Sequence, residues 1–153
     1  MNGPPLWQRL VQAHLVHIDA RVFALHLLGD ETHGRATRDL MIAVRQGRVR
    51  AQTSVMTLYQ LLAELYRRGE SGRASDLARD LTVHAGLDMV PVTPDIAIQA
   101  AEVRAQLGGR PERALQVATA LASRADLFLT TESGLRRIAG MSVANLEDLR
   151  PAA

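Results

Sequence analysis

Short apolar runs alternate with amphipathic segments along the chain. Residues 13–18 (AHLVHI) form an apolar run of strand length that ends at Asp19, and residues 21–30 then carry apolar side chains at helical spacing. The same order of strand and helix is expected three more times, at residues 49–53 and 57–68, 87–92 and 93–107, and 126–130 and 132–139. We expect further helices at residues 33–46, 71–85 and 111–123, and a fifth strand within residues 141–146.

This alternation predicts an α/β fold. Five strands separated by helices favour a three-layer sandwich, in which a mostly parallel five-stranded sheet is covered by helices on both faces. We expect one domain over residues 13–150 and an N-terminal extension over residues 1–12, which is either a loose segment or an extra helix around Leu6 and Trp7. In such sheets ligands bind outside the carboxyl ends of the strands, so polar residues at those ends are the candidates for chemistry.

Composition excludes several classes of function. The 153 residues contain no cysteine, which rules out a disulfide scaffold, a thiolate zinc site and a cysteine nucleophile. All 18 residues in the lysine-plus-arginine count are arginine, and the missing lysine excludes a P-loop. The net charge of +2 is only weak evidence for nucleic-acid binding. We expect a soluble cytoplasmic protein without a signal peptide or a membrane-spanning segment.

Two acidic residues follow predicted strands. Asp19 stands at the carboxyl end of the first strand, and Glu132 stands just beyond the strand at residues 126–130. A parallel sheet would bring these acids, which are distant in sequence, to the same edge. Each also has a simpler interpretation, Asp19 as the cap of the following helix and Glu132 as an acid favoured by a helix dipole. The residues alone leave both interpretations open.

The remaining polar and aromatic residues carry weaker signals. His17 alternates with Asp19 and therefore shares its side of the strand, as a pair of metal ligands would. A histidine that is hydrogen-bonded within the core is the favoured interpretation. Tyr59, Tyr66 and Phe128 lie on apolar faces and are expected in the core.

Three segments occur in an order that resembles PIN domains, most closely the VapC-type toxin ribonucleases of bacterial toxin–antitoxin systems. They are HIDARVFALHLL from residue 17, TSVMTLYQLLAEL from residue 53 and RPERALQVATALASRADLFLTTESGL from residue 110. The resemblance covers residues 13–149 and implies a nuclease, a hydrolase that cuts RNA with one or two Mg²⁺ or Mn²⁺ ions held by four acids. Carboxylates suit this task because hard divalent cations prefer oxygen ligands. The resemblance also implies a homodimer and an antitoxin protein as partner.

Two of the four family acids carry over to this chain. Asp19 matches the aspartate of the first strand and Glu132 matches the acid after the fourth strand, where Thr130 matches a hydroxyl residue that often accompanies it. Gln60 stands where the family has its second acid, and Arg113 stands where the family has an aspartate before Ala-Leu. An amide can still offer an oxygen to a cation, whereas a guanidinium repels one.

Two other acids lie close to the replaced positions. Glu64 follows Gln60 by one helical turn on the same face, from where its long side chain could reach inward. Glu112 adjoins Arg113 in sequence but lies about 100° around the helix from it, so we expect Glu112 to face solvent unless the helix starts there.

The resemblance leaves two functions open. In the first, the chain is a metal-dependent endoribonuclease with Asp19, Glu132 and either Gln60 or Glu64 around one ion. In the second, it is a degenerate PIN domain that binds RNA or protein, and Arg113 supplies the positive charge of the lost metal. In either case we expect Asp19, Glu132, Gln60 and Arg113 to line one cleft, and Arg113 to form an ion pair with one of the two acids. We expect weak or absent binding of Mg²⁺ or Mn²⁺, because affinity for hard cations follows the charge of the ligands.

Overall fold

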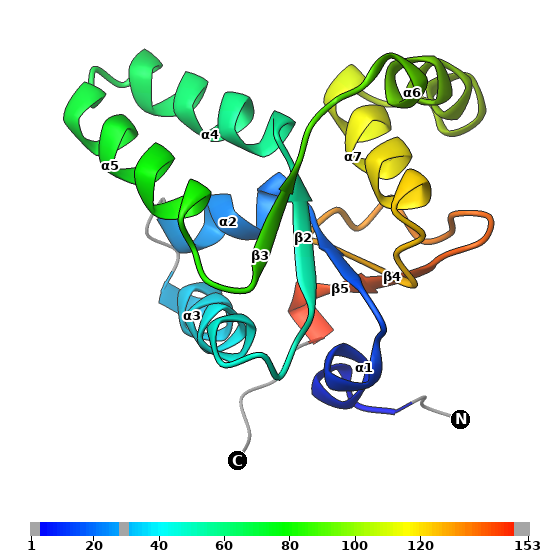
Figure 1. The fold of residues 1–153 in the computed structure, drawn as a ribbon, viewed down its shortest axis with the longest axis horizontal. Coiled ribbons are helices and arrows are strands. Elements are labelled where there is room, and N and C mark those ends of the chain that lie inside the picture. Colours follow the sequence, from blue (N-terminus) through cyan, green and yellow to red (C-terminus); the bar gives the residue numbers. More distant parts are fainter. Residues whose placement is uncertain (1–3, 28–30, 149–153) are drawn as a thin grey trace.

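The structure, a computed structural model, describes residues 4–27 and 31–148 and contains one five-stranded sheet between helices (Figure 1). The strands are β1 (Val16–Ile18), β2 (Ala51–Ser54), β3 (Leu87–Val90), β4 (Leu127–Thr130) and β5 (Ser142–Asn145). The helices are α1 (Leu6–Gln12), α2 (Ala20–Leu27), α3 (Glu31–Arg45), α4 (Met56–Arg67), α5 (Ser71–Thr82), α6 (Pro94–Leu107), α7 (Pro111–Ala122) and the short 3₁₀ helix η1 (Leu146–Asp148).

The strands are arranged in the order β3-β2-β1-β4-β5, and every neighbouring pair is parallel. The central strand β1 places Val16 opposite Ala51 of β2 and opposite Leu127 of β4. The predicted α/β sandwich is therefore confirmed, with a sheet that is parallel throughout its described strands. Because β1 and β4 are neighbours, the residues that follow them emerge side by side.

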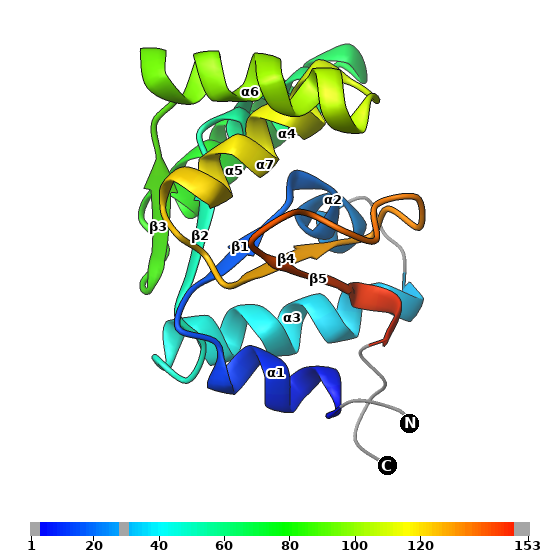
Figure 2. The ribbon, with the colours of Figure 1, turned by 90° about the vertical axis from the view of Figure 1, so that its right-hand side faces the viewer.

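The two faces of the sheet bury different side chains. Val16 and Ile18 of β1 pack with apolar residues of α1, α2 and α3, whereas Phe128 of β4 packs with α6 and α7. Figure 2 shows α6 and α7 on one side of the sheet and α1 and α3 on the other. His17 alternates with its neighbours and so faces the same side as Phe128, whose ring it stacks against. No helix within residues 4–27 and 31–148 is long and apolar enough to cross a membrane.

The structure defines the N-terminal segment and the start of the first strand. Of the two alternatives for residues 1–12, the structure shows the extra helix, α1, which buries Leu6 and Leu10 in the core. β1 begins only at Val16, whereas the apolar run suggested residue 13. The carboxylate of Asp126 accepts the backbone N–H groups of His14 at 2.9 Å and Leu15 at 2.7 Å, so these two N–H groups pair with a side chain instead of a strand.

Two expectations about local structure are wrong. Residues 132–139 form an irregular loop with a turn at residues 133–134 instead of a helix, because Gly134 weakens the helix and the loop instead buries Leu135 and Ile138 on its way to β5. Tyr59 and Tyr66 are 63% and 56% exposed, since α4 buries a different stripe that includes Leu61 and Leu65. The expected helix stop at Gly29 lies outside the described residues.

Candidate functional site

A small hollow lies at the carboxyl ends of β1 and β4. Asp19 follows β1 directly and Glu132 follows β4 by two residues, while α4 contributes Gln60 and α7 contributes Arg113. The structure thus brings together the four residues that were expected to share a cleft. Its full lining is Asp19, Arg21, Gln60, Arg110, Glu112, Arg113 and Glu132. The free space measures about 30 Å³, which is enough to hold a water molecule.

Asp19 is a buried carboxyl with one strong side-chain partner. Its side chain is only 5% exposed, and the hydroxyl of Thr130 donates to Oδ2 at 2.9 Å. Burial raises the pKa of Asp19 from 3.8 to about 6 because the charged form loses its hydration, while the Thr130 hydrogen bond opposes this shift. The nearby charge of Glu132 raises the pKa further, and Arg21 lowers it. Asp19 is therefore a carboxyl that titrates close to neutral pH.

Thr130 joins the two acids. Its Oγ1 also accepts the backbone N–H of Glu132 at 3.1 Å, so one hydroxyl holds both the side chain of Asp19 and the main chain beside it. Thr130→Val should therefore lower the free energy of unfolding by about 1–3 kcal/mol, because it leaves a buried acceptor and a backbone donor without their partner. Urea unfolding at neutral pH measures the loss. Thr131→Val is the matched control, and an equal loss in both variants would contradict the bridging role.

Glu132 forms ion pairs with two arginines. Arg21 Nη1 lies 2.9 Å from Glu132 Oε1, and Arg113 Nε lies 3.9 Å from Glu132 Oε2. The expected ion pair of Arg113 is thus present with Glu132, although its length falls short of a bidentate hydrogen bond. Sequence reasoning missed Arg21. Its position two residues after Asp19, in the first turn of α2, was the signal that it would face the same edge.

Arg113 has an unsatisfied donor. Its Nε is buried and has no hydrogen-bond partner within the described residues, because Glu132 Oε2 is too distant. The guanidinium packs against the main chain of Gly109, where an added Cβ would lie 3.2 Å from Nη1. Gly109 also has a φ of +81°, which favours glycine. The turn before α7 therefore leaves space for Arg113 while one of its N–H groups stays free for an acceptor.

The side chain of Gln60 is hydrogen-bonded to a buried residue. Gln116 of α7 donates from Nε2 to Gln60 Oε1 at 3.0 Å. Gln116 Oε1 in turn lies 2.8 Å from His17 Nε2, and Gln52 Nε2 lies 3.1 Å from His17 Nδ1. His17 is fully buried, and burial lowers the pKa of its ring from 6.5 to about 4. The prediction of a hydrogen-bonded core histidine is confirmed.

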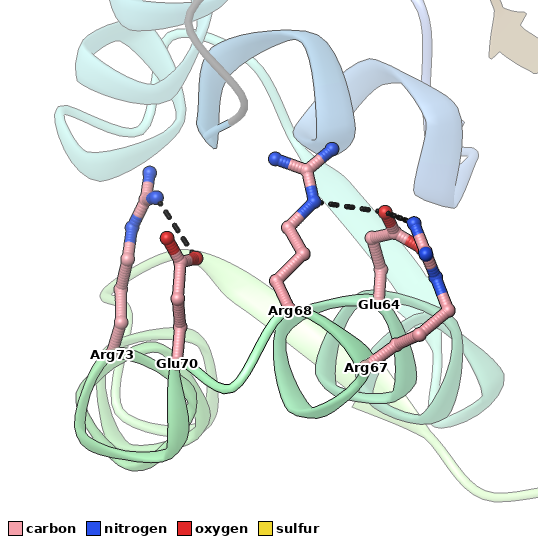
Figure 3. Close-up of polar contacts among 5 residues, drawn as sticks. All are labelled: Glu64, Arg67, Arg68, Glu70 and Arg73. Carbon is pink, nitrogen blue, oxygen red and sulfur yellow. Dashed lines mark hydrogen bonds and ion pairs between the residues drawn. The ribbon is translucent and has the colours of Figure 1, made fainter.

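The two substitute acids lie differently from what was expected. Glu64 does not line the hollow, because its carboxylate binds Arg67 at 2.6 Å and Arg68 at 2.9 Å (Figure 3). These hydrogen bonds lower the pKa of Glu64 to about 2. Glu112, expected to face solvent unless the helix starts there, is half-buried and does line the hollow. The physical reason is that α7 begins at Pro111, so Glu112 lies in its first turn, beside the edge of the sheet.

The residues of the hollow do not suit a divalent cation. Three arginines and three acids line it, so their formal charges cancel. Glu132 is engaged by arginines and the oxygen of Gln60 is engaged by Gln116, which leaves few free oxygen ligands. Within residues 4–27 and 31–148 there is no group of three or more histidine and acidic side chains that could hold a metal ion.

A comparison with protein-family models identifies one family. The family model of the PIN domain matches residues 16–141. No curated protein matches the chain in sequence.

Several solved structures are similar to this chain in fold. VapBC2 from Rickettsia felis, bound to a DNA fragment from its promoter, aligns with a TM-score of 0.67 and 14% identity over 86% of this chain and 98% of that chain. VapBC from Salmonella typhimurium, also bound to DNA, aligns with a TM-score of 0.63 and 18% identity over 86% of this chain and 97% of that chain. VapC20 from Mycobacterium tuberculosis, a toxin that cleaves the sarcin–ricin loop, aligns with a TM-score of 0.60 and 19% identity over 74% of this chain and 86% of that chain.

Proposed function

This chain belongs to the PIN-domain family, and on that premise we propose that it is a VapC-like protein of the toxin type that binds RNA without metal-dependent catalysis. The similar structures are toxins and toxin–antitoxin complexes, which supports a nuclease-toxin-like role. The observation that carries the absence of metal catalysis is Arg113, which replaces a family acid and lies beside Glu132.

Groups of the chain itself offset the negative charges of the acids in the hollow. Clustered buried carboxylates must take up protons or meet positive charge, and in the family the metal ion supplies that charge. Here burial raises the pKa of Asp19 to about 6, so a proton can neutralise it close to neutral pH. Glu132 lies between Arg21 and Arg113. Both acids are thus accommodated by the chain's own groups.

RNA is the ligand class that the arginines support. Arg21, Arg110 and Arg113 line the hollow, and Arg136 lines the adjoining depression together with Glu132. Guanidinium groups match the geometry of phosphate oxygens, and contacts to the phosphate backbone supply most of the affinity in binding without sequence preference. The proposed module therefore binds the RNA backbone at the edge where its relatives hold their acids.

A binding assay tests this proposal. We expect a fluorescent single-stranded oligoribonucleotide to bind with equal affinity in EDTA and in Mn²⁺, and to remain uncut in both. Arg21→Gln should weaken binding about three- to tenfold, because one phosphate contact is lost. Arg67→Gln, an exposed arginine outside the hollow, is the control. Mn²⁺-stimulated cleavage that disappears in Asp19→Asn would contradict the proposal.

A metal-dependent endoribonuclease remains the second candidate, because Glu112 lines the hollow together with Asp19 and Glu132. In that case Glu112 takes the place of the acid that Arg113 replaces. The discriminating result is cleavage in Mn²⁺ that is lost in Glu112→Gln and retained in Glu147→Gln, an exposed acid outside the hollow.

An antitoxin protein is the proposed partner, by analogy with the VapBC complexes. A groove next to the hollow would suit an apolar segment of such a partner, since it is lined by Ala20, Arg21, Ala24, Gln60, Leu61, Glu64, Leu65 and Leu77. The product of a small neighbouring reading frame is the partner to co-express. The homodimer also remains a proposal, and sedimentation at several concentrations tests it.

A further inference from the structure

A continuous chain of buried hydrogen bonds connects the sheet to the hollow. Thr53 Oγ1 lies 2.7 Å from the carbonyl oxygen of Ile18 and 2.6 Å from Thr57 Oγ1. Thr57 Oγ1 lies 2.9 Å from Gln116 Nε2, and the same nitrogen lies 3.0 Å from Gln60 Oε1. The chain therefore begins at a backbone carbonyl and ends at a side chain that lines the hollow.

The carbonyl of Ile18 determines the direction of every hydrogen bond in this chain. A carbonyl can only accept, so the single hydroxyl proton of Thr53 must be donated to it. Thr57 must then donate its own proton to Thr53, and its oxygen accepts from Gln116. The amide of Gln116 consequently directs its NH₂ group towards Thr57 and Gln60.

This direction decides which end of the Gln60 amide is free. Because Gln60 Oε1 accepts from Gln116, the NH₂ group of Gln60 is the end left for other partners, and no acceptor within the described residues binds it. Arg113 Nε–H is the second free donor at the hollow. Besides the three acids that line the hollow, a cation would meet these two donors, whereas an anionic oxygen would be bound by both donors. The space of about 30 Å³ suits one oxygen-sized group.

We propose that the hollow is a phosphate site, in which Gln60 and Arg113 donate to one phosphoryl oxygen, and that the buried chain from Ile18 makes Gln60 a donor. The inference rests on the proposed function for the source of that oxygen, the backbone of RNA. Gln60 is then a binding residue for an anion at a position where the family places a ligand of a cation. Gln116 is a positioning residue, which acts through Gln60.

The tautomer of His17 tests the hydrogen-bond direction without any ligand. Gln116 Oε1 can only accept, so it requires the proton of His17 on Nε2, while Nδ1 accepts from Gln52. Nitrogen-15 NMR of the histidine ring at neutral pH distinguishes the two nitrogens. The Nε2–H tautomer is expected. The Nδ1–H tautomer would mean that Gln116 is reversed and would overturn the assignment of Gln60 as a donor.

Titration with inorganic phosphate and with an oligoribonucleotide tests the anion site. We expect both ligands to shift the side-chain NH₂ signal of Gln60 and to leave that of Gln8, which is exposed on α1, unchanged. Gln60→Glu keeps an acceptor for Gln116 but replaces the donor by a negative charge, so affinity for both ligands should fall at least about tenfold. Gln8→Glu, which makes the same change in charge on α1 outside the hollow, is the control for charge and folding.

A second variant tests the positioning role of Gln116. Gln116→Glu offers only oxygens to Gln60, so the Gln60 amide should turn and direct its own oxygen to the hollow, which predicts a loss of phosphate affinity with the lining residues intact. If Gln116→Glu fails to fold, the shift of the Gln60 NH₂ signal of the wild-type protein on titration with phosphate still tests the anion site.

The possible failures are distinguishable. RNA binding without any change at Gln60 would overturn this inference and leave the proposed function standing. Inorganic phosphate that shifts Gln60, in a protein that does not bind RNA, would support the anion site and contradict the proposed function.

Discussion

A variant that combines Gln60→Glu with Arg113→Asp is expected to bind Mn²⁺ at least about 100-fold more tightly than the wild-type protein, because affinity for hard cations rises with ligand charge. The wild-type hollow is lined by three arginines and three acids, and the variant would have two arginines and five acids. Each neighbouring charge changes the interaction with a cation by about 1–4 kcal/mol at 4 Å, depending on its exposure to water. Isothermal titration calorimetry measures the gain.

The control for this experiment makes the same change in charge elsewhere. Gln8→Glu together with Arg79→Asp alters exposed side chains of α1 and α5 that do not line the hollow. We expect this pair to leave Mn²⁺ affinity unchanged. If the rebuilt variant binds Mn²⁺ no better than the control, the four positions do not act as one site, and Arg113 does not occupy the place of a metal ion.

Asp19→Asn is expected to lose about 3 kcal/mol of folding stability relative to the wild type as the pH falls from 6 to 3.8. Burial lowers the pKa of His17 to about 4, so between pH 6.5 and 4 only the unfolded chain binds this proton, and stability falls as the pH falls. Burial raises the pKa of Asp19 to about 6, so between pH 6 and 3.8 only the folded chain binds that proton, and stability rises as the pH falls. The two effects nearly cancel in the wild-type protein.

Each single substitution exposes the effect of the other residue. Asp19→Asn leaves only the effect of His17, and its stability relative to wild type should drop from pH 6 to 3.8, the range over which Asp19 titrates. His17→Gln leaves only the effect of Asp19, and its stability relative to wild type should rise by a similar amount from pH 6.5 to 4, the range over which His17 titrates. Urea unfolding at several pH values measures both differences. Other groups such as Glu64, whose pKa is lowered to about 2, are common to all three proteins and cancel in the comparison. Parallel curves for the three proteins would contradict the opposed titrations.

The strands and the two acids could be predicted because both depend on local pattern and on the geometry of parallel sheets. Asp19 and Glu132 each follow an apolar run, and the neighbouring strands β1 and β4 bring them to one hollow. The spacing of apolar residues does not indicate how a loop between two strands packs. Residues 132–139 have helix-like spacing, yet they bury Leu135 and Ile138 without forming a helix.

The hydrogen-bond network could not be predicted from periodicity. Gln116 lies in an alanine-rich helix, where a glutamine usually faces water, but it is fully buried because His17 and Thr57 supply partners from other elements. Such pairing depends on how α7 packs over the sheet, which no single segment encodes. The direction of the Gln60 amide follows from that packing, so the sequence alone left its oxygen available to a cation.

The most direct test of metal-free function is a calorimetric titration of Mn²⁺ into the wild-type protein and into Asp19→Asn under identical conditions. The arginines beside Glu132 and the engaged oxygen of Gln60 predict weak binding, or none, that does not differ between the two proteins. Tight binding to the wild type that disappears in Asp19→Asn would contradict this account and would establish a metal site at the hollow.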